Sequence, residues 1–133
     1  MTNETIRVSA VVLRDGGGRV LTVRKRGTAR FMLPGGKPEE GETPSQTALR
    51  EVSEELLVDL QPAALRHLGT FRADAANEVA TLVHAEVFVH PSVPVGDPAA
   101  EIDELRWLDL SQPLPPDLAP LLEHHVLPAL GAL

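Results

Sequence analysis

The order of apolar and polar residues along the chain predicts several β-strands. Ile6 to Leu13 is rich in Val and Ile, and Val20 to Lys25 forms a second apolar run. Asp15 to Gly18 lies between them as a turn sequence, so we expect the two runs to form a hairpin with a short loop. Further strands are predicted at Leu65 to Ala73, Ala80 to His90 and Ile102 to Leu110.

The segment from Thr43 to about Leu57 has the pattern of an amphipathic helix. Thr43 can cap this helix, Pro44 suits its first position, and Gln46 completes a capping box. Its apolar residues fall on one face, which predicts that the helix covers a core. They are Ala48, Leu49, Val52 and Leu56.

A second helix is predicted at the C-terminus, from Asp117 to Leu127. We expect Pro128 to stop it, because proline lacks an amide hydrogen and clashes with the preceding turn. The Pro-rich stretch from Pro91 to Ala100 predicts a loop. Strands precede, separate and follow the two helices, which predicts an α/β (α+β) fold, an α/β/α sandwich whose mixed sheet carries helices on both faces. One domain over residues 1–133 is expected.

Composition narrows the possible functions. Hydrophobic residues make up 43% of the 133 residues and charged residues 23%, as in a globular domain. The net charge of -7 argues against a protein that mainly binds DNA or RNA. A small anionic ligand remains possible, because a local arginine cluster or a bound cation can outweigh distant charge. The absence of Cys excludes disulfides, thiol catalysis and cysteine metal sites.

The N-terminal segment, Met1 to Arg7, has no apolar region after a basic start, so no signal peptide is expected. No apolar run approaches the roughly 18 residues that cross a bilayer. We therefore expect a cytoplasmic protein without a membrane partner. The apolar face of the C-terminal helix can bury against the core or against a second copy, which leaves monomer and homodimer open.

Three glutamates of the first helix suggest a metal site. Glu51, Glu54 and Glu55 fall within a sector of roughly 100° on a helix. Like charges at this spacing cost about a few tenths of a kcal/mol per pair. The alternative interpretation of these glutamates is a solvated acidic face. A divalent cation would turn the repulsion into coordination, and Mg²⁺ favours carboxylates together with water and phosphate oxygens. The sector lies beside the apolar stripe, hence near the rim of the core.

A glycine turn precedes this helix. Gly35 and Gly36 can bring bare backbone close to an ion or a phosphate. From Gly36 to Val58 the chain resembles the Nudix box of MutT-like hydrolases. The matching positions are Gly36, Glu42, Arg50, Glu51, Val52, Glu54, Glu55 and Val58.

Leu57 departs from the box, which has glycine at this position. A left-handed turn that suits glycine costs another residue about 1 kcal/mol or more. The helix is therefore expected either to end differently here or to end a residue later. The metal-facing positions are unchanged, so the departure does not predict loss of activity.

The resemblance implies Mg²⁺-dependent hydrolysis, with Mn²⁺ as a possible substitute. Water would attack phosphorus in a diphosphate linkage of a nucleoside diphosphate derivative. The metal ligands would be Glu51, Glu54, Glu55 and the Gly35 carbonyl. Glu54 is favoured over Glu51 as general base. Arg50 completes the catalytic set, as a support that pairs with the box glutamate, Glu42.

Three basic residues and one aromatic residue are candidates for contact with the substrate. Arg24, Lys25 and Arg26 precede the glycine turn and either contact phosphates or are exposed charges, and alternation sends Arg24 and Lys25 in opposite directions. Phe31 is the aromatic residue nearest the turn and the candidate for contact with a base. Either Glu101 or Glu104 can add a carboxylate or remain on the surface. The chain has no Tyr, so the residue that marks diadenosine polyphosphate hydrolases is absent. By elimination, the favoured substrate is an ordinary or oxidised nucleoside triphosphate.

Other functions are compatible with parts of this pattern. A Nudix-fold ligand-binding or sensor module without catalysis would be expected to have lost metal-helix residues, and Glu51, Glu54 and Glu55 are all present. A scaffold domain would use the acidic helix only as surface. A prenyl diphosphate isomerase of the same fold is a third alternative, although its cysteine-dependent form is excluded.

Overall fold

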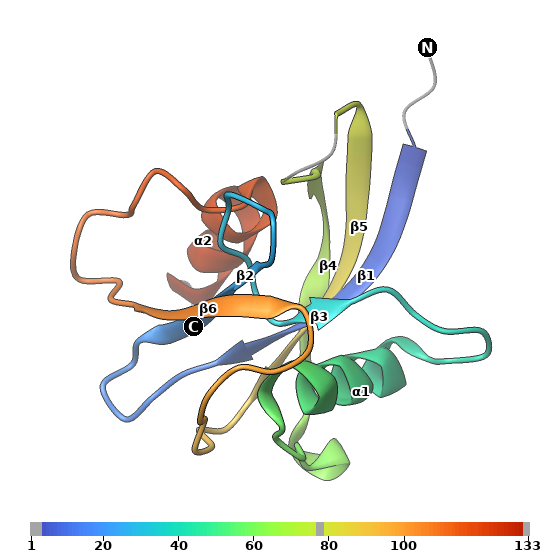
Figure 1. The fold of residues 1–133 in the computed structure, drawn as a ribbon, viewed down its shortest axis with the longest axis horizontal. Coiled ribbons are helices and arrows are strands. Elements are labelled where there is room, and N and C mark those ends of the chain that lie inside the picture. The colour runs from blue at the N-terminus through green and yellow to red at the C-terminus, as the bar shows by residue number, and fades with distance from the viewer. Residues whose placement is uncertain (1–3, 77–78, 132–133) are drawn as a thin grey trace.

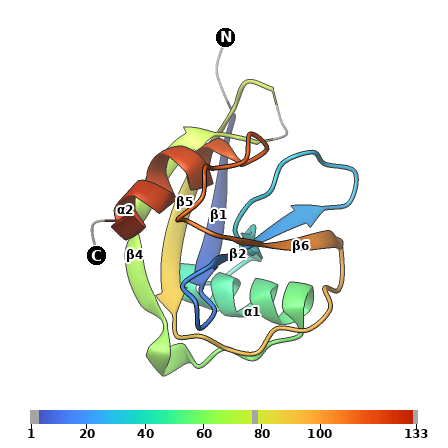
Figure 2. The same ribbon diagram turned by 90° about the vertical axis from the view of Figure 1, so that its left-hand side faces the viewer.

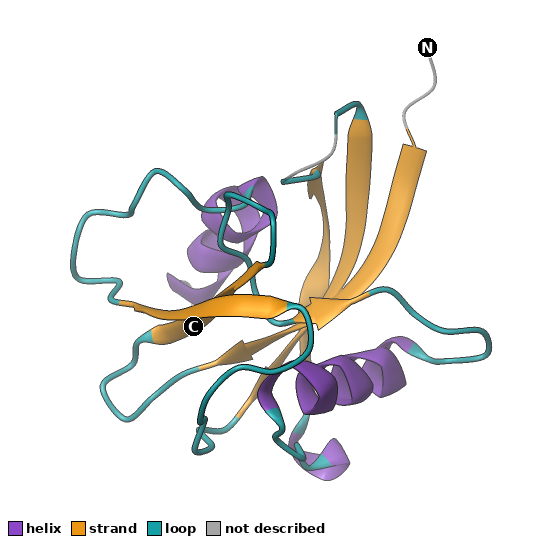
Figure 3. Ribbon diagram, viewed as in Figure 1, coloured by secondary structure: helices purple, strands orange, loops and turns teal. Residues whose placement is uncertain are grey.

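The computed structural model describes residues 4–76 and 79–131 (Figure 1). The strands are β1 (Glu4–Leu13), β2 (Val20–Lys25), β3 (Gly35–Gly36), β4 (Arg66–Asp74), β5 (Thr81–His90) and β6 (Ile102–Leu108). The helices are α1 (Pro44–Leu56), the short 3₁₀ turn η1 (Pro62–Ala64), and a C-terminal helix made of η2 (Leu122–Val126) and α2 (Leu127–Gly131) (Figure 3).

The larger sheet is mixed and has the strand order β3-β1-β5-β4. β1 runs parallel to β5 and antiparallel to β3, and β4 runs antiparallel to β5. The remaining strands, β2 and β6, form a separate antiparallel pair. The predicted turn is present, with an antiparallel bridge between Arg14 and Val20 and a hydrogen bond from the Asp15 N–H to the Arg19 carbonyl at 3.0 Å. The predicted pairing of the two strands beyond it is wrong, because β1 and β2 lie in different sheets. β5 pairs with β1 from Glu4 to Leu13, β3 pairs with it at Ser9 and Ala10, and β2 pairs with β6 instead.

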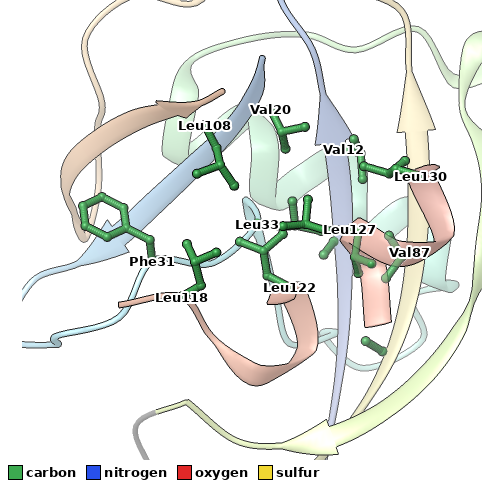
Figure 4. Packing of buried hydrophobic residues seen from close by; sticks show 13 residues of the cluster. Val12, Val20, Phe31, Leu33, Val87, Leu108, Leu118, Leu122, Leu127 and Leu130 are labelled. Atoms are coloured by element: carbon green, nitrogen blue, oxygen red, sulfur yellow. The ribbon is translucent and has the colours of Figure 1, made fainter. Parts of the chain in front are cut away.

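Helices cover both faces of the larger sheet (Figure 2). Successive side chains of a strand point to opposite faces, and those of β1 divide between two cores. Val11 and Leu13 pack in the core that contains α1 residues, whereas Ala10 and Val12 pack in the core that contains the C-terminal helix. Figure 4 shows residues of the second core. The predicted α/β/α arrangement is confirmed.

Helix α1 begins and ends as its local sequence dictates. The capping box is present: the Gln46 amide donates to Thr43 Oγ1 at 3.3 Å, and the Thr43 amide donates to Gln46 Oε1 at 2.9 Å. Leu57 adopts the left-handed conformation, with φ 55° and ψ 39°, and its N–H donates to the Ser53 carbonyl at 3.0 Å. The chain thus keeps the left-handed turn at the position where the Nudix box has glycine. The residue that makes this turn is a leucine that is 75% exposed.

The C-terminal helix does not stop at Pro128, so that prediction is wrong. The helix continues to Gly131. A wide π turn, Leu122–Val126, precedes the proline, and the Leu127 N–H donates to the Leu122 carbonyl five residues back. This turn shifts the hydrogen-bond register just where proline would otherwise clash with the carbonyl of a regular α-helix. Within the described residues, no helix is long and apolar enough to cross a membrane.

Candidate active site

Two acidic residues of α1, Glu51 and Glu55, lie directly against the glycine turn. Glu55 is 1% exposed, and its Oε1 accepts a hydrogen bond from the Gly35 N–H at 3.0 Å. A Cβ on Gly36 would overlap the Glu51 carboxylate, and one on Gly35 would overlap the Ser9 carbonyl. Gly35 also has a φ of 155°. Gly36 is needed because the Glu51 carboxylate lies directly against the β3 backbone, and Gly35 is needed because the β1 backbone lies directly against it.

Arg50 ties α1 to the loop before it. Its Nε and Nη2 donate to the two carboxylate oxygens of Glu42 at 2.7 and 3.0 Å, a bidentate pair. Nη1 donates to Glu51 and to Glu54, both at 3.0 Å, and Nη2 also donates to the Lys37 carbonyl at 2.9 Å. The hydrogen bond from Arg50 lowers the pKa of Glu42 to about 2. This network fixes the glycine turn and the helix as one unit.

Burial changes the acidity of two of these carboxyls. It raises the pKa of Glu55 to about 8, although the hydrogen bond from Gly35 acts in the opposite direction. Burial also raises the pKa of Glu51. The second carboxylate oxygen of Glu55, Oε2, is buried and has no hydrogen-bond partner among the described residues. An orphaned buried oxygen of this kind fits a positively charged ligand, since a cation compensates the lost hydration.

The three carboxylates lie on one side of α1 but do not surround a common point. Glu51 and Glu54 both turn to Nη1 of Arg50, while Glu55 turns to Gly35. Across the part of the chain that the structure describes, no three acidic or histidine side chains are arranged to hold an ion. Glu51 and Glu54 would have to turn from the guanidinium to share a cation with Glu55.

The basic residues at the end of β2 separate as alternation predicts. Arg24 pairs with Asp103 and Glu104, each at 3.2 Å. Lys25 instead faces the cavity beside the glycine turn and pairs with Glu101 at 3.3 Å. The structure therefore brings Lys25 and Glu101 to the candidate site and holds Arg24 and Glu104 together away from it.

The loop before β6 connects α1 to the end of β2. The Ala99 N–H donates to the Glu55 carbonyl at 2.8 Å, and the Arg26 N–H donates to the Glu101 carbonyl at 2.8 Å. The Arg26 guanidinium reaches the Ala100 carbonyl at 3.4 Å. Arg26 thus braces this loop rather than pointing to the glycine turn.

Phe31 lies in the core and not in the cavity. The residue is 3% exposed and belongs to the cluster of buried side chains in Figure 4. The Arg106 guanidinium carbon lies 3.7 Å from the centroid of its ring. Its backbone bridges to Leu118. Sequence proximity to the glycine turn suggested a contact with a base, but neither face of the ring is open to one.

A cavity of about 210 Å³ opens beside the glycine turn. Its walls come from β1, β5, the turn after β4 and the start of the C-terminal helix, and Lys25, Thr28 and Lys37 also line it. Sequence reasoning missed Thr28 and Lys37. The position of Lys37 directly after Gly36 was the available signal, whereas nothing local marks the cavity, because its walls are far apart in the sequence.

Comparisons with known proteins bear on this site. The family model of the NUDIX domain matches residues 4–130. The MutT NUDIX hydrolase from Burkholderia pseudomallei is 22% identical over 96% of this chain and 97% of its own, with a TM-score of 0.73. The E. coli dihydroneopterin triphosphate pyrophosphohydrolase is 23% identical over 82% of this chain and 84% of its own, with a TM-score of 0.63.

A third solved structure is the NUDIX domain of Shewanella oneidensis NrtR in complex with ADP ribose. It is 20% identical over 80% of this chain and 74% of its own, with a TM-score of 0.64. No curated protein matches the chain. At these identities the solved structures establish the shared fold.

The fold and the glutamate-bearing helix beside a glycine turn define a hydrolase of the Nudix class. The family model spans almost the whole chain, and the chain belongs to the NUDIX domain family. The predicted family and enzyme class, a Nudix hydrolase, are confirmed. Members of this family generally use divalent metal ions and have pyrophosphohydrolase-type activity.

Proposed function

We propose that this protein hydrolyses a diphosphate linkage in a nucleoside diphosphate derivative and depends on Mg²⁺. An ordinary or oxidised nucleoside triphosphate is the favoured substrate. The observation that carries the proposal is the placement of Glu55, buried beside Gly35 with one oxygen unpartnered among the described residues. Glu51 and Glu54 flank it on the same side of α1.

Glu51, Glu54, Glu55 and the Gly35 carbonyl would hold the ion, with Mn²⁺ as a substitute. A bound divalent cation neutralises phosphate charge and lowers the pKa of water. Glu54 is the favoured general base: its side chain is 51% exposed against 14% for Glu51, so water reaches it directly. Arg50 would hold α1 to the preceding loop through its bidentate pair with Glu42.

Lys25 and Lys37 are the best-placed residues for phosphate oxygens. Both residues line the cavity beside Gly35 and Gly36, next to the proposed reaction site. Lys25 would exchange its 3.3 Å contact with Glu101 for a phosphate contact. Arg24 and Arg26, which are held by β6 and by the loop before it, support this strand end.

The test is hydrolysis by Glu54→Gln in the presence of Mg²⁺. We expect turnover to fall by about a hundredfold or more, the usual contribution of a general base, with an unchanged circular dichroism spectrum. Glu40→Gln is the matched control, because Glu40 is exposed and lies in the preceding loop. Full activity in Glu54→Gln would refute the assigned role of the helix. A protein that binds nucleotides but hydrolyses none would be a sensor module.

A further inference from the structure

Two arginines and a histidine form a row across three strands of the larger sheet. Arg7 of β1 is the register partner of His84 of β5, and His84 is in turn the register partner of Arg72 of β4. Side chains directly opposite each other on neighbouring strands lie on the same face of a sheet. The three side chains therefore stand next to one another, and we call them the basic row.

The basic row lies on the face of the sheet that α1 covers in part. Val11 of β1 packs in the core that contains α1 residues, and alternation along the strand places Arg7 on the same face. The strands β1, β5 and β4 extend beyond α1, so the basic row is not covered by the helix (Figure 1). The cavity beside the glycine turn is lined by Val8 and Val83, which pack against the core on the opposite face. The basic row is therefore separate from that cavity.

The basic row borders a hollow of about 260 Å³, to which Thr5 and Leu82 also contribute. Neighbouring strands lie about 4.8 Å apart, so the backbones of Arg7 and Arg72 are roughly 10 Å apart, with His84 between them. The two long side chains can converge above the histidine from opposite sides. A small ion in the hollow would contact both guanidinium groups.

Two carboxylates, Glu86 and Asp74, share this face with the basic row. Glu86 has both oxygens in hydrogen bonds, one of them at 3.3 Å from His84 Nε2. Asp74 follows Arg72 by two residues on β4. Among residues 4–76 and 79–131, no ion pair joins either carboxylate to Arg7 or Arg72. Like charges on neighbouring strands destabilise a sheet, and a bound anion would remove this repulsion.

We propose that the basic row is a binding site for a phosphate or diphosphate ion, separate from the carboxylates of α1. A guanidinium group presents a planar fork of donors that matches phosphate oxygens, and here two such forks flank one position. Thr5 adds a hydroxyl group at the border of the hollow. The chain has a net charge of -7, so the attraction for such an ion is local to this row.

The test is isothermal titration calorimetry of inorganic pyrophosphate with the full chain in metal-free buffer. Without a divalent cation the carboxylates of α1 repel phosphate, so binding there is suppressed. We expect wild type to bind pyrophosphate, and Arg7→Gln and Arg72→Gln each to bind it about tenfold more weakly, because each loses a charge-assisted contact. Absence of binding to wild type at millimolar pyrophosphate, or unchanged affinity in both variants, would overturn the proposal.

Arg66→Gln is the matched control. Arg66 is exposed on the same strand as Arg72, but its register partner is Val89, which packs against the core on the opposite face. This variant loses the same charge and should bind pyrophosphate as wild type does. Equal weakening in Arg66→Gln would mean that pyrophosphate responds only to general surface charge, which would also overturn the proposal. Circular dichroism checks each fold, and Arg7→Gln decides the matter if Arg72→Gln does not fold.

Discussion

Two residues at the end of α1 have an environment or a backbone conformation that is unusual for their residue type. Glu55 is a carboxyl buried almost completely, and Leu57 is a leucine in a left-handed conformation. They are two residues apart, at the end of α1. Glu55 could be predicted from the spacing of glutamates on a helix, whereas its burial could not, because the loop that covers the end of α1 comes from residues near Ala99.

Leu57→Gly should stabilise the protein. Replacing leucine removes the strain of a left-handed non-glycine residue, about 1 kcal/mol or more, and part of this gain is lost to the greater entropy of glycine in the unfolded chain. We expect the free energy of unfolding to rise by about 0.5 kcal/mol in urea titrations. Leu57→Ala keeps a Cβ and should show no such gain. A loss of stability in Leu57→Gly would mean that the exposed leucine makes contacts that outweigh the strain.

Glu42 should make stability depend on pH in the acid range. Arg50 lowers the pKa of Glu42 from 4.5 to about 2, so the folded state binds the proton less tightly than the unfolded state. This contribution is fully present above pH 4.5 and is lost as the pH falls to about 2. Urea unfolding of Glu42→Gln should therefore show a flatter dependence on pH across this window. Glu40→Gln should keep the wild-type dependence, and identical curves for all three proteins would contradict the assignment.

At the level of elements, local patterns predicted helix α1 closely and the strand pairing poorly. The capping box and apolar stripe of α1 involve residues within one or two turns of one another. The pairing of β1 with β5 joins residues such as Val11 and Phe88, and no local pattern encodes that choice. The predicted end of the C-terminal helix at Pro128 was wrong because no sequence pattern indicates the π turn that precedes the proline.

The capping box of α1 gives a prediction at this scale. Thr43→Ala removes the hydroxyl that accepts from the Gln46 amide, and it should lower the free energy of unfolding by about 1 kcal/mol. Thr43→Ser keeps the hydroxyl and is the matched control. Equal stability of Thr43→Ala and wild type in urea titrations would show that water replaces the cap at no cost. Because α1 carries the carboxylates, activity of Thr43→Ala should also fall earlier on heating.

For the molecule as a whole, the fold places a motif that is continuous in the sequence beside a cavity whose walls come from distant parts of the chain. The motif from Gly36 to Glu55 is continuous in sequence and could be recognised there. The cavity is assembled from both ends of the chain, including Val8 and Leu121, and only the folded structure reveals it. Phe31 was expected to contact the substrate, but it is buried by Leu118 and Arg106, which are far from it in the sequence.

The most direct measurement is release of phosphate or pyrophosphate from a panel of diphosphate compounds, with Mg²⁺ and with a chelator. The panel contains ordinary and oxidised nucleoside triphosphates, ADP-ribose, nucleotide sugars, dinucleoside polyphosphates and coenzyme A. We predict release that requires Mg²⁺, returns when the metal is restored, and is greatest for the triphosphates. Release that persists in chelator, or no release from any compound by the folded protein, would contradict a metal-dependent site on α1.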